Sequence, residues 1–286
     1  MGTSQSSSGP GAGVALVPPW AADLPPEPEP EPDSPSPDPS DTEPGDAEPS
    51  DTDDSPPGPA TSPVAVPGRF RDARRSLGSF ARRGDTVDLR RAVGHYVSSG
   101  YGGASTMGRR LAATSATASR LGGVVTSGQS PDGTDLRDQV LASGADANQI
   151  VDAIVEAVRP VDGTQDAEAS RRAVRDALSD LLEQFPDADP LALDAAQRDF
   201  VIERYTALDV YNRFALDMQR TVIEKAPDAT TALSRMKQIQ AYIREQVAAG
   251  FRRVRDRGAT PTSRGVAAMV RSALAETLLI FEEYLG

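Results

Sequence analysis

The chain has 286 residues, with 42 acidic and 30 basic side chains, one histidine, one tryptophan and no cysteine. The lack of cysteine excludes a disulfide framework, a thiolate zinc site, an iron–sulfur cluster and a cysteine nucleophile. A single histidine also excludes any metal site that needs two histidines from one chain.

Residues 1–67 differ sharply in composition from the rest of the chain. They contain 18 of the 24 prolines, 13 acidic residues and no lysine or arginine, so the other 219 residues carry only 30 − 29 = +1. Because proline removes backbone donors and neighbouring carboxylates repel, we predict a long disordered tail in coil or polyproline II. We recognise no targeting segment and no membrane span, so the cytoplasm is the expected location.

Residues 68–125 are predicted to form a small, basic helical region. Eleven arginines oppose three aspartates there, a net charge of +8. Apolar residues at helical spacing predict a helix over 69–82, and a second helix is expected to begin at Asp85 or Thr86. The glycines at 100–103 favour the turn that ends it.

A third helix, rich in small residues, is predicted over about 105–121. The glycine- and serine-rich stretch 122–133 is interpreted as a linker. Residues 126–286 are then predicted to form a helical bundle domain, in which Asp146 with Gln149 gives the first capping-box pattern.

Three long C-terminal helices are the predicted scaffold of this bundle. Asp194 with Gln197 is expected to open the longest, over roughly 195–226, and no window alternates as a strand would, so the fold class is all-α. The residues predicted to face inward are Val201, Tyr205, Leu208, Tyr211, Ala215, Met218 and Val222, then Leu233, Met236, Ile243, Val247 and Val254, and finally Val266, Val270, Leu274, Leu278, Phe281 and Leu285.

The arginine-rich zone is the first candidate site. Its positive field is consistent with nucleic-acid phosphates, with a docked protein, with pairing to the acidic tail, or with a plain solvated face. The residues of this candidate nucleic-acid or docking patch are Arg69, Arg71, Arg74, Arg75, Arg82, Arg83, Arg109 and Arg110.

No constellation of residues supports an enzyme. His95 has no accompanying serine-nucleophile motif, and the glycines at 100–103 lack the ending of a phosphate-binding loop. The C-terminal carboxylates, among them Glu203, Asp209 and Asp217, show no E-x-x-H pattern and are interpreted as solvated helix faces. We therefore expect no catalytic residue, no metal site and no cofactor.

The extreme N-terminus is the second candidate site. Removal of Met1 would expose the α-amine of Gly2, whose unperturbed pKa of about 7.7–8.0 leaves an appreciable neutral fraction near pH 7. Gly2 has no side chain to block attack, and the residues after it are small and polar. The same residues also match the pattern for N-myristoylation, which requires a eukaryotic-type acyltransferase.

Several short motifs together resemble a known family. The motifs are Met1-Gly2-Thr3-Ser4, the apolar Leu16-Val17-Pro18-Pro19-Trp20 before the acidic tract, Arg69-Phe70-Arg71-x-Ala73-Arg74 with Phe80-Ala81-Arg82, and Ala92-Val93-x-x-Tyr96-Val97 leading to Gly102-Gly103-Ala104 and Arg109-Arg110. They are similar to the QatB family of the four-gene Qat bacterial antiphage systems. The resemblance is expected to be most specific at the N-terminus and over 69–122, with the C-terminal helices sharing only helical character.

The resemblance implies a non-enzymatic accessory protein of antiphage defence. Its expected partners resemble a QueC-like deazaguanine enzyme (QatC), an ATPase and a TatD-like nuclease. A QueC-like enzyme activates a carboxylate with ATP and passes it to an amine, so the N-terminus would serve QatC as a docking element or an acceptor while the helical body acts as an assembly scaffold. The modification and partner-binding residues would be Gly2, Thr3, Ser4, Leu16, Val17 and Trp20. The alternative is an arginine-patch adaptor that brings phage DNA to the nuclease.

Overall fold

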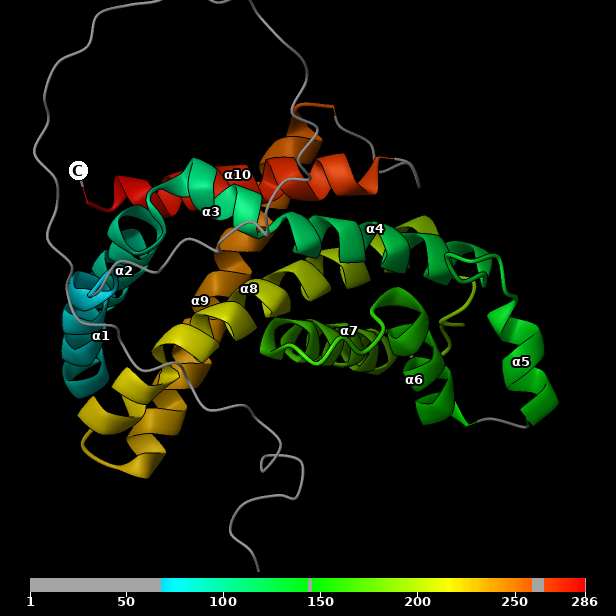
Figure 1. Ribbon diagram of the computed structural model, residues 1–286, viewed down its shortest axis with the longest axis horizontal. Helices are drawn as coiled ribbons and strands as arrows, with labels where there is room; N and C mark the ends of the chain where they lie inside the picture. The colour runs from blue at the N-terminus through cyan, green and yellow to red at the C-terminus, as the bar shows by residue number, and fades with distance from the viewer. Residues whose placement is uncertain (1–67, 144–145, 259–264, 286) are drawn as a thin grey trace, which may run out of the picture. The chain divides into compact units, whose positions relative to one another are not determined.

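The computed structural model describes residues 68–143, 146–258 and 265–285 (Figure 1). Every regular element in those ranges is a helix, and the β-type pairing there is limited to one isolated bridge between Gln129 and Asp135. The all-α prediction is confirmed. The predicted disorder of residues 1–67 lies outside the described residues.

The arginine-rich region begins with two packed helices. α1 (Arg71–Arg83) and α2 (Thr86–His95) contact each other, and the Asp85 carboxylate caps α2 by accepting a hydrogen bond of 2.9 Å from the Val87 amide. A single π-helical turn, η2 (Tyr96–Gly100), continues α2. The predicted helix start and the predicted turn are both present.

The predicted third helix is in fact two helices. α3 (Ala104–Arg110) and α4 (Ala112–Ser127) are separated at Leu111. α4 runs through the first half of the predicted linker, and the missing side chain of Gly122 lets α4 approach its neighbours closely. A Cβ atom there would lie 3.2 Å from the Ile202 side chain. The linker prediction is therefore wrong for residues 122–127.

The rest of the described chain is also helical. Both predicted capping boxes are present, one at the start of α6 and one at the start of α8. α5 was not predicted, since its eight residues are too few to show a clear period. The bounds are α5 (Leu136–Ser143), α6 (Ala147–Val158), α7 (Gln165–Gln184), α8 (Ala195–Lys225), α9 (Ala229–Asp256) and α10 (Val266–Glu283).

One hydrophobic core joins these helices. α8 contacts α1, α4, α7 and α9, whereas α10 contacts α2, α3, α4 and α9; Figure 1 shows α3 and α4 running along α10. Phe80 of the basic region and Tyr205 and Phe251 of the bundle belong to the same buried cluster. The predicted domain boundary between residues 68–125 and 126–286 stays a prediction. Side chains from both sides of that boundary contribute to this one core.

Most residues predicted to face inward are buried or half-buried, with two exceptions. Leu233 is 59% exposed, because the neighbouring Ala232 takes the inward position on α9 and one residue rotates the side chain by about 100°. Leu285 is 36% exposed and lies beyond the end of α10. The inward prediction is wrong at these two leucines.

Candidate functional site

The predicted N-terminal site residues, Gly2, Thr3, Ser4, Leu16, Val17 and Trp20, lie outside the described residues. The two lysines, which carry the side-chain primary amines of the chain, are described. Both are exposed, Lys225 in the last turn of α8 and Lys237 within α9. The stem of Lys225 packs on α1, since a Cβ atom at Gly78 would lie 3.3 Å from the Lys225 Cγ.

An aromatic cluster lies beside the arginine-rich zone and ties it to α8. The Tyr96 ring stacks on Phe70 with centroids 5.5 Å apart and meets the edges of Tyr101 at 5.1 Å and Phe214 at 4.9 Å. Both tyrosine hydroxyls donate to one oxygen of Asp217, Tyr96 at 2.9 Å and Tyr101 at 2.8 Å. Burial is the main cause that raises the pKa of each tyrosine, so both remain neutral donors.

Three of the predicted patch arginines gather on this cluster. The Arg69 guanidinium lies 4.4 Å from the centre of the Phe70 ring and 5.4 Å from that of Tyr101. Arg74 lies 5.8 Å from the Phe70 centre and Arg110 lies 5.9 Å from the Tyr101 centre. These are cation–π distances, so all three guanidinium groups lie against rings of this one cluster.

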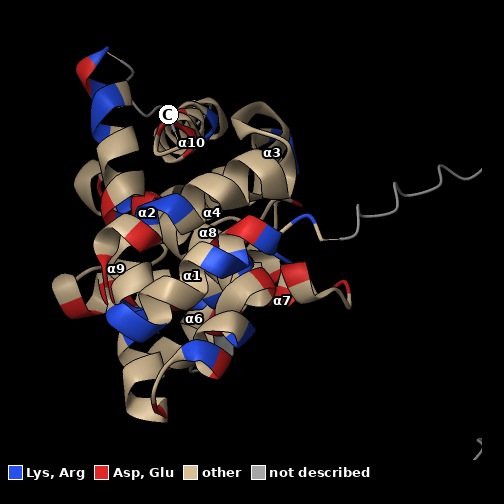
Figure 2. Cartoon of the chain, turned by 90° about the vertical axis from the view of Figure 1, so that its left-hand side faces the viewer, with Lys and Arg blue, Asp and Glu red and all other residues tan. Residues whose placement is uncertain are grey.

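The other five predicted arginines do not join that group. Arg75 and Arg83 each pair with an aspartate, at 3.5 Å and 2.6 Å. Arg109 donates to two hydroxyls of its own helix. Arg71 and Arg82 are exposed, and no carboxylate of the described residues forms an ion pair with either. Figure 2 shows basic and acidic segments mixed on the face that carries α1, so the zone is not one uniform patch.

A polar pocket that was not predicted from the sequence lies among α3, α4, the α6–α7 connection, α7 and α8. Its volume is about 260 Å³. Its charged lining has three arginines and two aspartates from segments far apart in the chain, with hydroxyl groups between them. The lining residues used below are Arg110, Thr114, Arg159, Asp166, Asp209 and Arg213.

Asp209 is the buried carboxylate of this pocket. Its side chain accepts a 2.6 Å hydrogen bond from the Thr114 hydroxyl, and the residue is only 6% exposed. Burial raises the pKa of the Asp209 carboxyl, while the Thr114 bond and the Arg213 charge oppose that rise. The interpretation of Asp209 as part of a solvated helix face is therefore wrong.

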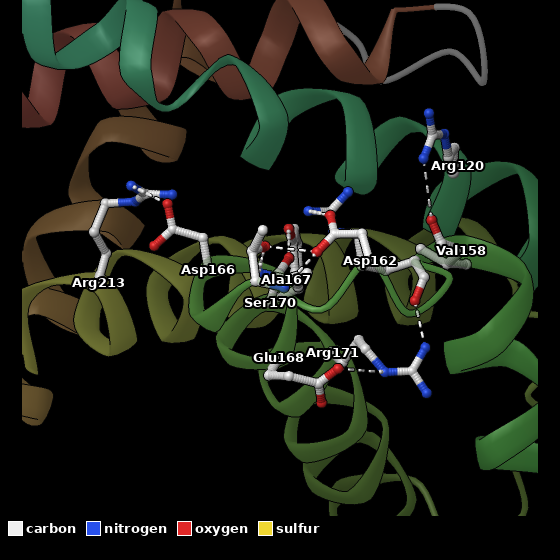
Figure 3. Close-up of polar contacts among 12 residues, drawn as sticks. Arg120, Val158, Asp162, Asp166, Ala167, Glu168, Ser170, Arg171 and Arg213 are labelled. Carbon is white, nitrogen blue, oxygen red and sulfur yellow. Dashed lines mark hydrogen bonds and ion pairs between the residues drawn. The ribbon is translucent and has the colours of Figure 1, made fainter. Parts of the chain in front are cut away.

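Two guanidinium groups of the pocket have buried donors without an acceptor. Arg213 pairs with Asp166 at 3.0 Å, and Arg159 pairs with Asp162 at 2.9 Å; Figure 3 shows Asp166 beside Arg213 near the start of α7. The Nε atom of each arginine is buried, and within the described part of the chain neither has a hydrogen-bond partner. The spacing of Asp209 and Arg213, four residues apart beside an inward stripe, was the one sequence signal for this site.

The expectations of no metal site and no membrane span can be examined only on the described residues. There, no group of three or more histidine, aspartate and glutamate side chains is placed to hold a metal ion. No helix of the described chain is long and apolar enough to cross a membrane. His95 is half-buried at the end of α2, where its backbone carbonyl accepts a hydrogen bond from Ser99.

Comparison with known proteins matches the chain to a protein family. A family model described as Qat anti-phage system associated protein QatB matches residues 102–281, whereas no curated protein and no solved structure matches the chain. The match runs from the residues just before α3 into α10, so it contains the whole polar pocket and excludes α1 and α2. The expectation that the C-terminal helices share only helical character with the family is wrong, because the match covers α4 to α9 and most of α10. The motifs at the N-terminus and over 69–101 lie outside the match.

Proposed function

The chain belongs to the QatB family of Qat anti-phage system associated proteins, and from this premise we propose that its N-terminus is the acceptor for a QueC-like partner enzyme, QatC. Family membership makes the protein an accessory component of antiphage defence. In the proposal the chain is not itself an enzyme. Its helical body is the scaffold that holds other components of the same system.

The proposed chemistry is formation of an amide at Gly2. The partner enzyme activates the carboxylate of a deazaguanine with ATP. The neutral Gly2 amine then attacks the activated carbonyl carbon, the activating group leaves, and one proton is lost from nitrogen. The α-amine suits this role because its unperturbed pKa of about 7.7–8.0 is more than two units below that of a lysine, about 10.4.

The placement of the competing amines is the observation that carries the proposal. Lys225 and Lys237 lie on the long helices α8 and α9, and the stem of Lys225 packs against α1. Reaction at either lysine would require an active-site cleft to accept a helix surface. A chain terminus with no side chain at its first residue enters a narrow cleft more easily.

A defence assay tests the proposal. A short polar extension placed before Gly2, and retained in the cell, converts the amine into a peptide bond, so we expect loss of phage protection. The matched control carries the same residues between Asp54 and Ser55, where the amine is untouched, and should protect like the natural chain. Full protection by the extended variant, at equal protein abundance, would refute the acceptor role.

A second candidate function, a nucleic-acid adaptor for a TatD-like nuclease, is favoured by one observation. Arg69, Arg74 and Arg110 lie within cation–π distance of one aromatic cluster, and no described carboxylate forms an ion pair with any of them. If they contact phosphates, changing all three to Gln should weaken DNA binding and reduce the slope of log K against log salt by roughly two to three. An unchanged slope, compared with an Arg75→Gln, Arg83→Gln control, would exclude this group as the binding site.

A further inference from the structure

We propose that the polar pocket among α3, α4, α7 and α8 binds a small phosphorylated molecule, held by Arg110, Arg159 and Arg213. The inference is independent of any chemistry at Gly2. It concerns residues that all lie inside the family match, and the pocket is formed by described residues alone.

The first argument is the unmet hydrogen bonding of the pocket. Arg159 and Arg213 each have a buried Nε–H group without an acceptor in the described chain. Buried donors are nearly always satisfied in folded proteins, and an exception indicates an ion, a water or a ligand. Both donors belong to side chains that line one pocket, and the several oxygens of a phosphoryl group are acceptors suited to them.

The second argument is the solvent exposure of the carboxylates that pair with these arginines. The Arg159 and Arg213 side chains are 22% and 18% exposed, whereas their partners Asp162 and Asp166 are 41% and 53% exposed. The guanidinium groups are thus recessed relative to the carboxylates that pair with them. The remaining carboxylate, Asp209, accepts from Thr114 and forms no ion pair with Arg159 or Arg213 in the described residues.

The third argument is the arginine at the rim. Arg110 is exposed and forms no ion pair with any described carboxylate, and its guanidinium is held 5.9 Å from the Tyr101 ring. Arginine is the residue best suited to bidentate contact with phosphoryl oxygens. Arg110 therefore supplies positive charge that is not already neutralised within the pocket.

Pocket size and the nearby helix end define the ligand class. A volume of about 260 Å³ suits a phosphate or pyrophosphate group with a small substituent, and it is below the usual range for larger ligands. Thr164, the N-cap of the 20-residue helix α7, also lines the pocket. The positive end of that helix dipole adds to the arginines in favouring an anion.

Titration calorimetry on the full chain, with sodium pyrophosphate as the probe, tests the proposal. We expect saturable binding with a stoichiometry near one, weaker binding of inorganic phosphate, and weaker binding still of citrate, whose charge is carried by carboxylates. Citrate binding as tight as pyrophosphate would overturn the phosphoryl assignment. Absence of pyrophosphate binding would overturn the site, and binding of a 5′-phosphorylated oligonucleotide in that case would favour the nucleic-acid adaptor instead.

Variants locate the bound probe. Arg110→Gln and Arg213→Gln should each weaken pyrophosphate binding about tenfold or more, the loss expected for a hydrogen bond to a charged group. The control is Arg220→Gln, also on α8, where the side chain is 90% exposed and pairs with Glu224. Arg110 is exposed, so its variant decides the matter even if Arg213→Gln folds poorly. Equal affinity of the Arg110→Gln and Arg220→Gln variants would refute the proposed contacts.

Discussion

Arginines have different environments in the two regions that the family match separates. In the α1–α2 region, outside the match, Arg71, Arg74 and Arg82 are exposed and form no ion pair with a described carboxylate. Inside the match, arginines of α7 and α8 such as Arg171 and Arg213 are mostly recessed and paired with carboxylates on neighbouring turns or helices.

This contrast separates two uses of the same residue type. Exposed arginines contribute a positive field but little stability, because solvent screens them and holding a long side chain costs entropy. Recessed arginines link helices, since removing one breaks an ion pair to a neighbouring helix and empties a partly buried space that the guanidinium filled. Arginine content alone therefore indicates neither a binding surface nor a structural network.

The largest expected effect comes from glycines that set helix packing in the two regions. A Cβ atom at Gly250 of α9 would lie 2.5 Å from the Ala273 carbonyl oxygen of α10, whereas one at Gly78 of α1 meets the flexible Lys225 side chain at 3.3 Å. We expect Gly250→Ala to destabilise the protein by about 1–3 kcal/mol, the usual cost of overpacking. Gly78→Ala should be near neutral, because the gain in helix propensity offsets a small displacement. Urea unfolding measures both, and equal effects would contradict the packing described.

The second comparison uses one arginine from each region. Arg213→Gln should lower the free energy of unfolding by about 2 kcal/mol, because Asp166 loses its partner and the buried Asp209 loses a nearby positive charge. Arg82→Gln should change it by less than about 0.5 kcal/mol. Thermal unfolding at low and moderate salt provides the test. A larger loss of stability for Arg82→Gln than for Arg213→Gln would contradict the roles given to the arginines of the two regions.

The third comparison tests the contact that joins the regions. Tyr96→Phe removes the hydroxyl that donates to Asp217 on α8 and keeps the ring stacked on Phe70. A loss of about 1 kcal/mol is expected, the usual net value of one hydrogen bond. Tyr101→Phe, which removes the other donor to the same oxygen, should cost a similar amount, and the pair should be non-additive. Strict additivity would mean that the two hydroxyls do not share Asp217.

The smallest expected effect is a pH dependence at Asp209. Its native pKa is raised, so the native state holds the proton more tightly than the unfolded chain does, and the contribution to stability falls as pH rises through the native value. Asp209→Asn lacks this proton and can still accept the Thr114 bond. The variant should therefore gain stability relative to the natural chain as pH rises above about 4, the unperturbed pKa of an aspartate. Parallel stability profiles would show that burial does not shift this carboxyl.

The sequence predicted the helices better than the sites, for a physical reason. Capping boxes at Asp146 and Asp194 and apolar spacing along α8 are local signals, and the structure contains each of them. The polar pocket depends on Arg110, Arg159 and Arg213, which are distant in sequence and meet only through packing. Periodicity also cannot distinguish a solvated aspartate from Asp209, whose burial depends on Thr114 of another helix.

The central functional claim concerns Gly2, and mass spectrometry of the N-terminal peptide tests it most directly. The natural chain and a Lys225→Arg, Lys237→Arg variant are each co-expressed with the QueC-like partner and its deazaguanine supply. We predict that the peptide beginning at Gly2 carries the mass of one amide-linked deazaguanine in both proteins, because neither lysine takes part. An unmodified Gly2 peptide, or an adduct that disappears with the lysines, would contradict the account.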